Sequence, residues 1–180
     1  IGHPLFLMGL YVFLFAYVFP GRIADLGGSS RGLVTYVLAG LVPWLAFSES
    51  MTRGTEAIIV EGRLVKQVVF PVEVLPIKIA VVAFVSQLVT TPVLFVVILI
   101  ADNGIPTTAF LLLPLMALQL MAMIGVNFAL SALTVYFRDI RELVRVFTTA
   151  GLFLAPILYR PEWIDQVFAP FGLFLQLNPF

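Results

Sequence analysis

Charged side chains are scarce in this 180-residue sequence, and eight of its twenty Asp, Glu, Lys and Arg residues gather between positions 49 and 78. On a helical wheel, residues 49–70 put polar side chains on one face and apolar side chains on the other. Pro71 would end such a helix, and Pro76 suits the first turn of the next one. This pattern predicts an amphipathic helix that docks a soluble partner; the alternative is a solvated loop between two membrane spans. The candidate docking residues are Arg53, Glu56, Arg63, Lys66 and Gln67.

Two further groups of residues could have a role in binding. A second charged patch occupies positions 137–145, FRDIRELVR, with Arg138, Asp139 and Arg141 as its candidate residues. The aromatic side chains of the first apolar run could line a channel by stacking on sugar rings, although packing is the commoner role of such residues. The candidates for a channel lining are Tyr11, Phe15 and Tyr17.

The residue types needed for catalysis or metal binding are almost absent. The sequence contains no cysteine and one histidine, His3, and no Walker A, zinc-type histidine or nucleophile-elbow pattern. The apolar runs carry almost no ionisable residues, which argues against a proton-coupled transporter and an intramembrane enzyme. We therefore expect no catalytic residue, no metal site and no cofactor in this chain. Its energy, if it needs any, would come from a partner.

A few polar residues interrupt the apolar runs, and we expect them to be hydrogen-bond partners between helices rather than a substrate site. They are Ser86, Gln87, Gln119, Asn127 and Ser131.

The composition predicts a polytopic membrane protein. The chain is 61% hydrophobic and 11% charged, with a mean hydropathy of +1.09, whereas soluble domains have about 25% charged residues. The formal net charge is zero, so charge offers no argument for nucleic-acid binding. The apolar runs predict spans at 4–20, 33–48, 77–101 and 107–136. A fifth run, 146–159, is either a half-span or a full span that extends back over Leu143.

The charged segments also predict the orientation. Segments 49–78 and 137–145 are separated by two spans, so they must lie on one side of the membrane. They hold seven Lys and Arg residues against three on the other side, which places them in the cytoplasm. Residues 160–180, rich in proline and aromatic residues, then form an outer re-entrant segment. Because the chain begins at Ile1 and ends within a pattern, we expect it to be a fragment.

Four stretches resemble one known family, the permease subunits of ABC-2-type polysaccharide exporters. They occur in the family's order and at its spacing: YVLAGLVP at 36–43, LVKQVVFPVEVLP at 64–76, VYFRDIRELV at 135–144, and PILYRP at 156–161 with Leu177-Asn178-Pro179. This sequence departs from the family's pattern at two places. Glu61-Gly62 stands where the family has a neutral pair, and Gln67 stands where the family has a second lysine. Both differences change the charge that the segment would offer to a partner.

The resemblance implies an all-α, polytopic ABC-2-type transmembrane domain with five of six spans in residues 1–180. Segment 49–76 would be the cytoplasmic coupling segment, and its docking residues would bind a separate ABC ATPase that holds the ATP. The resemblance further implies a homodimer in the bacterial cytoplasmic membrane, exporting a lipid-linked glycan of O-antigen, capsule or teichoic-acid type. The alternatives are an ABC-2 permease for a drug or lipid, a membrane-embedded transferase and a non-ABC membrane subunit.

Overall fold

Helices make up every regular element in the part of the chain that the structure describes. The computed structural model describes residues 2–13, 30–60, 71–102, 107–154 and 157. The elements are α1 (Gly2–Phe13), α3 (Ser30–Gly54), α4 (Ala57–Val60), α6 (Val74–Asp102), the 3-10 helix η2 (Thr107–Leu111), α7 (Leu112–Tyr136) and α8 (Ile140–Leu154). The prediction of an all-α membrane-protein fold is confirmed.

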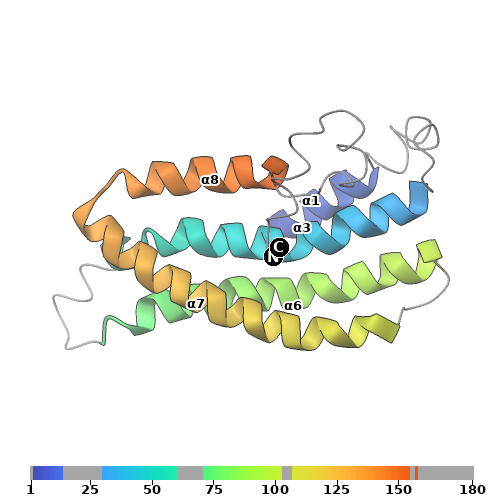
Figure 1. Cartoon of the computed structure of the whole chain (residues 1–180), viewed down its shortest axis with the longest axis horizontal. Coiled ribbons are helices and arrows are strands. Elements are labelled where there is room, and N and C mark those ends of the chain that lie inside the picture. Colours follow the sequence, from blue (N-terminus) through green and yellow to red (C-terminus); the bar gives the residue numbers. More distant parts are fainter. Residues whose placement is uncertain (1, 14–29, 61–70, 103–106, 155–156, 158–180) are drawn as a thin grey trace, which may run out of the picture.

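The four long helices lie side by side and alternate in direction (Figure 1). α3 packs most extensively on α6 and also contacts α7, α8 and α1. One buried cluster joins α3 to α6 through Leu38, Leu41, Val42 and Leu94. A second cluster, made of Ala46, Ala80, Ala83 and Met123, adds α7. The small alanines let the three helices approach closely, as at many helix interfaces in membranes.

Two of the described helices are long and apolar enough to cross a membrane. They are Val74–Leu99 within α6 and Ala109–Tyr136, which includes the end of η2 and all of α7. These helices match the spans predicted at 77–101 and 107–136. The outer faces of both helices carry exposed Leu, Val and Met side chains, as expected where lipid replaces water around a protein. Helix α8 extends the fifth predicted run back beyond Leu143, to Ile140.

The hydroxyl residues of α6 are bonded within the helix itself. The Oγ of Ser86 donates to the backbone oxygen of Val82 at 3.2 Å, and the Oγ1 of Thr91 donates to that of Gln87 at 2.8 Å. Thr90 Oγ1 contacts the backbone oxygens of Ser86 and Gln87 at 3.2 and 3.0 Å. These local bonds satisfy buried hydroxyl groups that would otherwise be costly in hydrocarbon.

The continuous amphipathic helix predicted for residues 49–70 is wrong in its first half. α3 continues beyond the predicted span end at Ser48 and stops at Gly54. The chain then turns, with the Oγ1 of Thr55 donating to the backbone oxygen of Thr52 at 2.7 Å, and the short α4 follows. Residues 61–70 lie outside the described part of the chain. The interruption falls at Gly54, and a glycine disfavours a helix by about 1 kcal/mol relative to alanine, which the helical wheel does not take into account.

The structure confirms the prediction that a proline fits the start of the next helix. Pro76 lies in the first turn of α6, which begins at Val74. A helix leaves its first four backbone N–H groups without intrahelical partners, so a proline there sacrifices no hydrogen bond.

Candidate functional site

The charged residues of both predicted segments meet at one end of the bundle. α3 and α7 end there, and α6 and α8 begin there (Figure 1). Segments far apart in the sequence therefore form one surface, as expected if they lie on the same side of a membrane. We call this surface the charged end and define it by Glu49, Arg53, Glu56, Arg138, Asp139, Arg141, Glu142 and Arg145.

One ion pair links the two charged segments directly. Arg141, in the first turn of α8, places Nη1 3.8 Å from Oε1 of Glu56, which lies in the turn between α3 and α4. Both side chains are partly exposed, so the pair contributes at most about 1 kcal/mol to stability. The Nε of Arg141 is buried and has no protein partner. The pair places the α3–α4 turn beside the start of α8.

The other predicted residues of the charged end lie on its surface. Arg53 pairs with Glu49 at 2.9 Å, one helical turn earlier, and its side chain remains 60% exposed. Arg138 and Asp139 occupy the turn between α7 and α8 and are exposed. Such side chains are accessible to a soluble partner.

Beneath the charged end, Asn127 of α7 joins three helices. Its Nδ2 donates to the Oγ of Ser50 in α3 at 2.9 Å and lies 3.4 Å from the backbone oxygen of Pro76 in α6. Asn127 and Ser50 are both completely buried. Gly54 faces the same amide, and a Cβ at that position would overlap with Oδ1 of Asn127. The end of α3, the start of α6 and the middle of α7 are therefore held as one unit.

A second amide contact, which is partly buried, lies farther from the charged end. The Nε2 of Gln87 in α6 donates to Oε1 of Gln119 in α7 at 2.9 Å. The Nε2 of Gln119 in turn donates to the backbone oxygen of Pro43 in α3, also at 2.9 Å. Hydrogen bonds across helices at Gln87, Gln119 and Asn127 confirm their predicted role. The prediction is wrong for Ser86 and Ser131, which bond to the backbone of their own helices.

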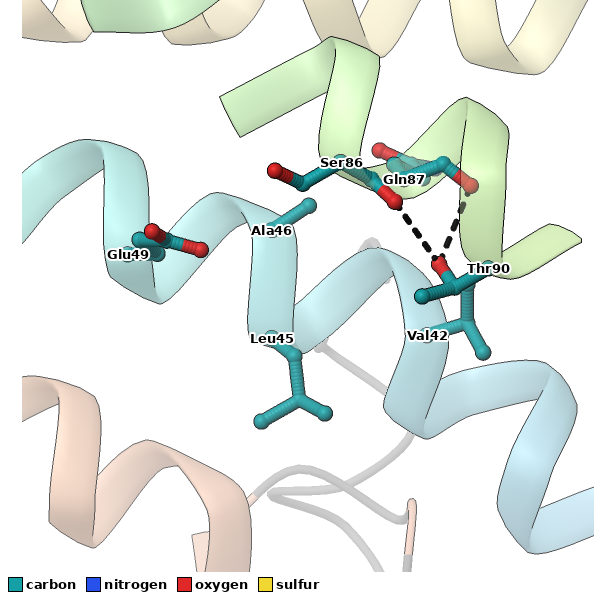
Figure 2. Close-up of a pocket in the computed structure, with 7 residues that line it drawn as sticks. All are labelled: Val42, Leu45, Ala46, Glu49, Ser86, Gln87 and Thr90. Atoms are coloured by element: carbon teal, nitrogen blue, oxygen red, sulfur yellow. Dashed lines mark hydrogen bonds between the residues drawn. The ribbon is translucent and has the colours of Figure 1, made fainter. Parts of the chain in front are cut away.

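A small pocket lies beside Gln87, between α3 and α6 (Figure 2). Glu49, Ser86, Gln87 and Thr90 supply its polar wall, and Val42, Leu45 and Ala46 supply the rest. Its volume of about 10 Å³ is near the minimum needed for one water molecule.

The contact between α8 and α3 depends on a glycine that the sequence analysis did not single out. Gly151 is buried against Trp44, and a Cβ there would lie 2.5 Å from the indole ring. The ring of Trp44 also lies near that of Phe47, with 6.4 Å between centroids. The sequence signal for this contact was a spacing: Gly151 follows Val144 by seven positions, which places both residues on the same face of a helix. Both are buried in α8.

Several predicted residues lie outside the described part of the chain: Arg63, Lys66, Gln67, Phe15, Tyr17 and the segment 160–180. Tyr11 is described; it is half-buried and packs against the cluster around Leu38. A channel-lining role for these aromatic residues stays a prediction.

The geometry defines a class of protein. Apolar helices suited to a membrane, linked by amide hydrogen bonds and carrying most of their charges at one end, are typical of a helical membrane protein. No known family model matches the chain.

Individual relatives of the chain are export permeases. The chain is 32% identical over 178 residues to an O-antigen export system permease protein RfbA of Myxococcus xanthus, covering 98% of this chain and 65% of the relative. Two proteins of the same name from Klebsiella pneumoniae are 28% and 26% identical over 171 residues, 94% of this chain and 63% of each relative. The chain is homologous to O-antigen export permeases over nearly all its length, which confirms the resemblance to ABC-2-type exporters. It spans 63–65% of the length of these relatives.

Proposed function

We propose that the chain is the transmembrane core of a permease subunit that exports a polysaccharide across the bacterial cytoplasmic membrane. The observation that carries this proposal is the 32% identity to an O-antigen export permease over 98% of the chain. The helical bundle supports it, because α6 and α7 are suited to a membrane. The cargo would be a lipid-linked glycan, and two copies of the subunit would form the transport unit.

The energy would come from a separate ABC ATPase that docks on the charged end. An exposed basic side chain, Arg53, and the exposed turn at Arg138 and Asp139 offer complementary charges to such a partner. Rim charges of this kind mostly set the orientation and rate of association. Arg63, Lys66 and Gln67 would extend the same docking surface.

The buried amide below the charged end offers a route by which ATPase movement would reach the membrane helices. A displacement of the α3–α4 turn acts on Gly54 and Ser50, both in contact with Asn127. Asn127 belongs to α7 and also faces the first turn of α6. The ion pair between Glu56 and Arg141 adds α8 to the same unit. The four long helices would then move together rather than separately.

The test is co-purification of the ATPase with the full-length permease. Reversing two charges, with Arg63→Glu and Lys66→Glu together, is expected to lower ATPase recovery and polysaccharide export while membrane levels stay normal. The matched control is Arg22→Glu with Arg31→Glu, which makes the same charge change on the opposite side and should leave ATPase recovery unchanged. Normal recovery and normal export in the first double variant would refute the docking role.

A further inference from the structure

Where α7 reaches the charged end, it carries two strongly exposed aromatic side chains, which we call the aromatic pair. Tyr136, the last residue of α7, is 82% exposed, and Phe137 next to it is 64% exposed. Tyr136 continues the exposed face of α7 to which Leu118 and Leu133 also belong, because side chains three or four positions apart share one face of a helix.

The backbone changes from regular to irregular at the same point. α7 ends at Tyr136, and the N–H of Phe137 still donates to the backbone oxygen of Leu133 at 2.8 Å. Arg138 and Asp139 then form an exposed turn. Irregular backbone exposed to lipid does not occur within the hydrocarbon layer of a membrane, because its polar groups would lack partners. The hydrocarbon layer around α7 must therefore end before Arg138.

The length of the span gives the same position. The candidate span Ala109–Tyr136 has 28 residues, which corresponds to about 42 Å of helix. A bilayer has about 30 Å of hydrocarbon and measures about 40–45 Å with its headgroup regions. Phe110, at the other end of the span, is 77% exposed. Both ends of the span therefore reach the headgroup regions, where the aromatic belts of membrane proteins lie.

We propose that the aromatic pair binds the lipid headgroup region of the leaflet at the charged end and fixes the boundary of the hydrocarbon layer at this point of α7. The rings present apolar faces to the acyl chains, and the hydroxyl of Tyr136 hydrogen-bonds to lipid ester or phosphate oxygens. Arg138 and Asp139 then lie in water, within reach of a soluble partner. Asn127 lies about 13 Å deeper along the helix, within the hydrocarbon layer.

The surroundings of the aromatic pair favour lipid over a protein as its partner. The exposed face of α7 is apolar at Leu118, Ala129 and Leu133. No Asp, Glu, Lys or Arg occurs between residues 107 and 137. Lipid that covers this face therefore also reaches the rings at its end. The inference does not depend on ATPase docking, because a soluble ATPase contacts only what lies outside the membrane.

The test uses the full-length permease alone, otherwise free of cysteine, in nanodiscs of phosphatidylethanolamine and phosphatidylglycerol. Single cysteines at Ala129, Leu133, Arg138 and Asp139 carry a nitroxide and leave the aromatic pair in place. Electron paramagnetic resonance compares collisions with oxygen, which concentrates in hydrocarbon, and with a nickel chelate, which stays in water. Oxygen is expected to dominate at Ala129 and Leu133, and the chelate at Arg138 and Asp139. The crossover between the two reagents then falls at the aromatic pair.

Two protein occupants would give different results, and either result would overturn the proposal. If a second copy of the chain covers this face, a nitroxide at Leu133 will collide with neither reagent. If the ATPase covers the rings, the nitroxide at Leu133 will collide with the chelate in the permease alone and will be protected only when the ATPase is added.

Removing the rings tests whether they fix the boundary. Tyr136→Leu with Phe137→Leu keeps apolar bulk and removes both rings. When the lipids are exchanged for others with longer acyl chains, the crossover should stay at the aromatic pair in the unaltered protein. It should move by about two residues, about 3 Å of helix, in the double variant. Phe128→Leu, which removes an aromatic ring from the interior of the same helix, is the matched control and should behave as the unaltered protein does. An equal response of the double variant and the unaltered protein would show that the rings fix nothing, and the proposal would fail.

Discussion

Gly54, the last residue of α3, lies directly against the side-chain amide of Asn127 in the middle of α7. A methyl group at Gly54 would force this amide away from Ser50, its hydrogen-bond partner. Two otherwise separate features of the sequence, a helix end and a buried asparagine, therefore depend on each other.

Gly54→Ala should destabilise the protein by about 1–3 kcal/mol, because a buried amide loses its hydrogen bond. The measurement is thermal or denaturant unfolding of the purified protein in detergent. Gly125→Ala in α7 is the matched control, since nothing lies within 4 Å of a Cβ at that position. There, replacing glycine in a helix is expected to stabilise by about 0.5–1 kcal/mol. Equal effects of the two substitutions would contradict the contact with Asn127.

The hydrogen bond between Gln87 and Gln119 should appear as an interaction energy in a double-mutant cycle. Gln87→Leu and Gln119→Leu are compared with the double variant by unfolding in detergent. Hydrogen bonds between membrane helices average about 0.6 kcal/mol and reach about 1.7 kcal/mol, so a value in that range is expected. Strictly additive effects would show that the two amides do not interact.

Gly151→Ala should loosen the contact between α8 and α3, because the added methyl group meets the ring of Trp44. We expect a loss of about 1–3 kcal/mol, the usual cost of overpacking. Trp44→Leu provides space at the same point, so the double variant should be less destabilised than the sum of the two single variants. Unfolding of the four proteins tests this, and full additivity would refute the steric explanation.

The ion pair between Glu56 and Arg141 should matter more for transport than for stability. Glu56→Arg brings two cations together and is expected to lower export, while changing the free energy of unfolding by no more than about 1 kcal/mol. Adding Arg141→Glu restores opposite charges and should recover export. Export is measured as surface polysaccharide in a strain that depends on this protein. Failure of the exchanged pair to recover export would mean that Glu56 acts through another contact.

The orientation can be tested with single cysteines, since residues 1–180 contain none. Cysteines at Arg53 and Asp139 should react with a membrane-impermeant reagent only when the cytoplasmic face is exposed. A cysteine at Ser29 should react only from outside. The two charged segments hold seven Lys and Arg residues and the opposite side holds three, and this difference predicts that the charged segments face the cytoplasm. If the cysteines at positions 53 and 139 reacted from opposite faces of the membrane, the two charged segments could not lie at the same end of the bundle.

The sequence was sufficient to predict those features that depend on local patterns. Long apolar runs predicted α6 and α7, and the change to charged residues after Tyr136 marked the end of α7. Features that depend on contacts between distant residues were not predictable in this way. Gly54 at the end of α3 lies against Asn127, and no periodicity in residues 49–70 records the position of a residue on another helix. The direction of the bonds from Gln87 through Gln119 likewise depends on Pro43, which lies on a third helix.

The order of synthesis determines when the amide contacts between α3 and α7 can form. Gln119 follows Pro43 by 76 positions, and Asn127 follows Ser50 by 77. At about 5–20 residues per second, α3 leaves the ribosome on the order of 4–15 s before its partners in α7. During that interval the hydroxyl of Ser50 and the end of α3 lack the contacts that hold them in the finished bundle. In the newly made chain, the hydrogen bonds that join α3 to α7 therefore form only after α7 has been synthesised.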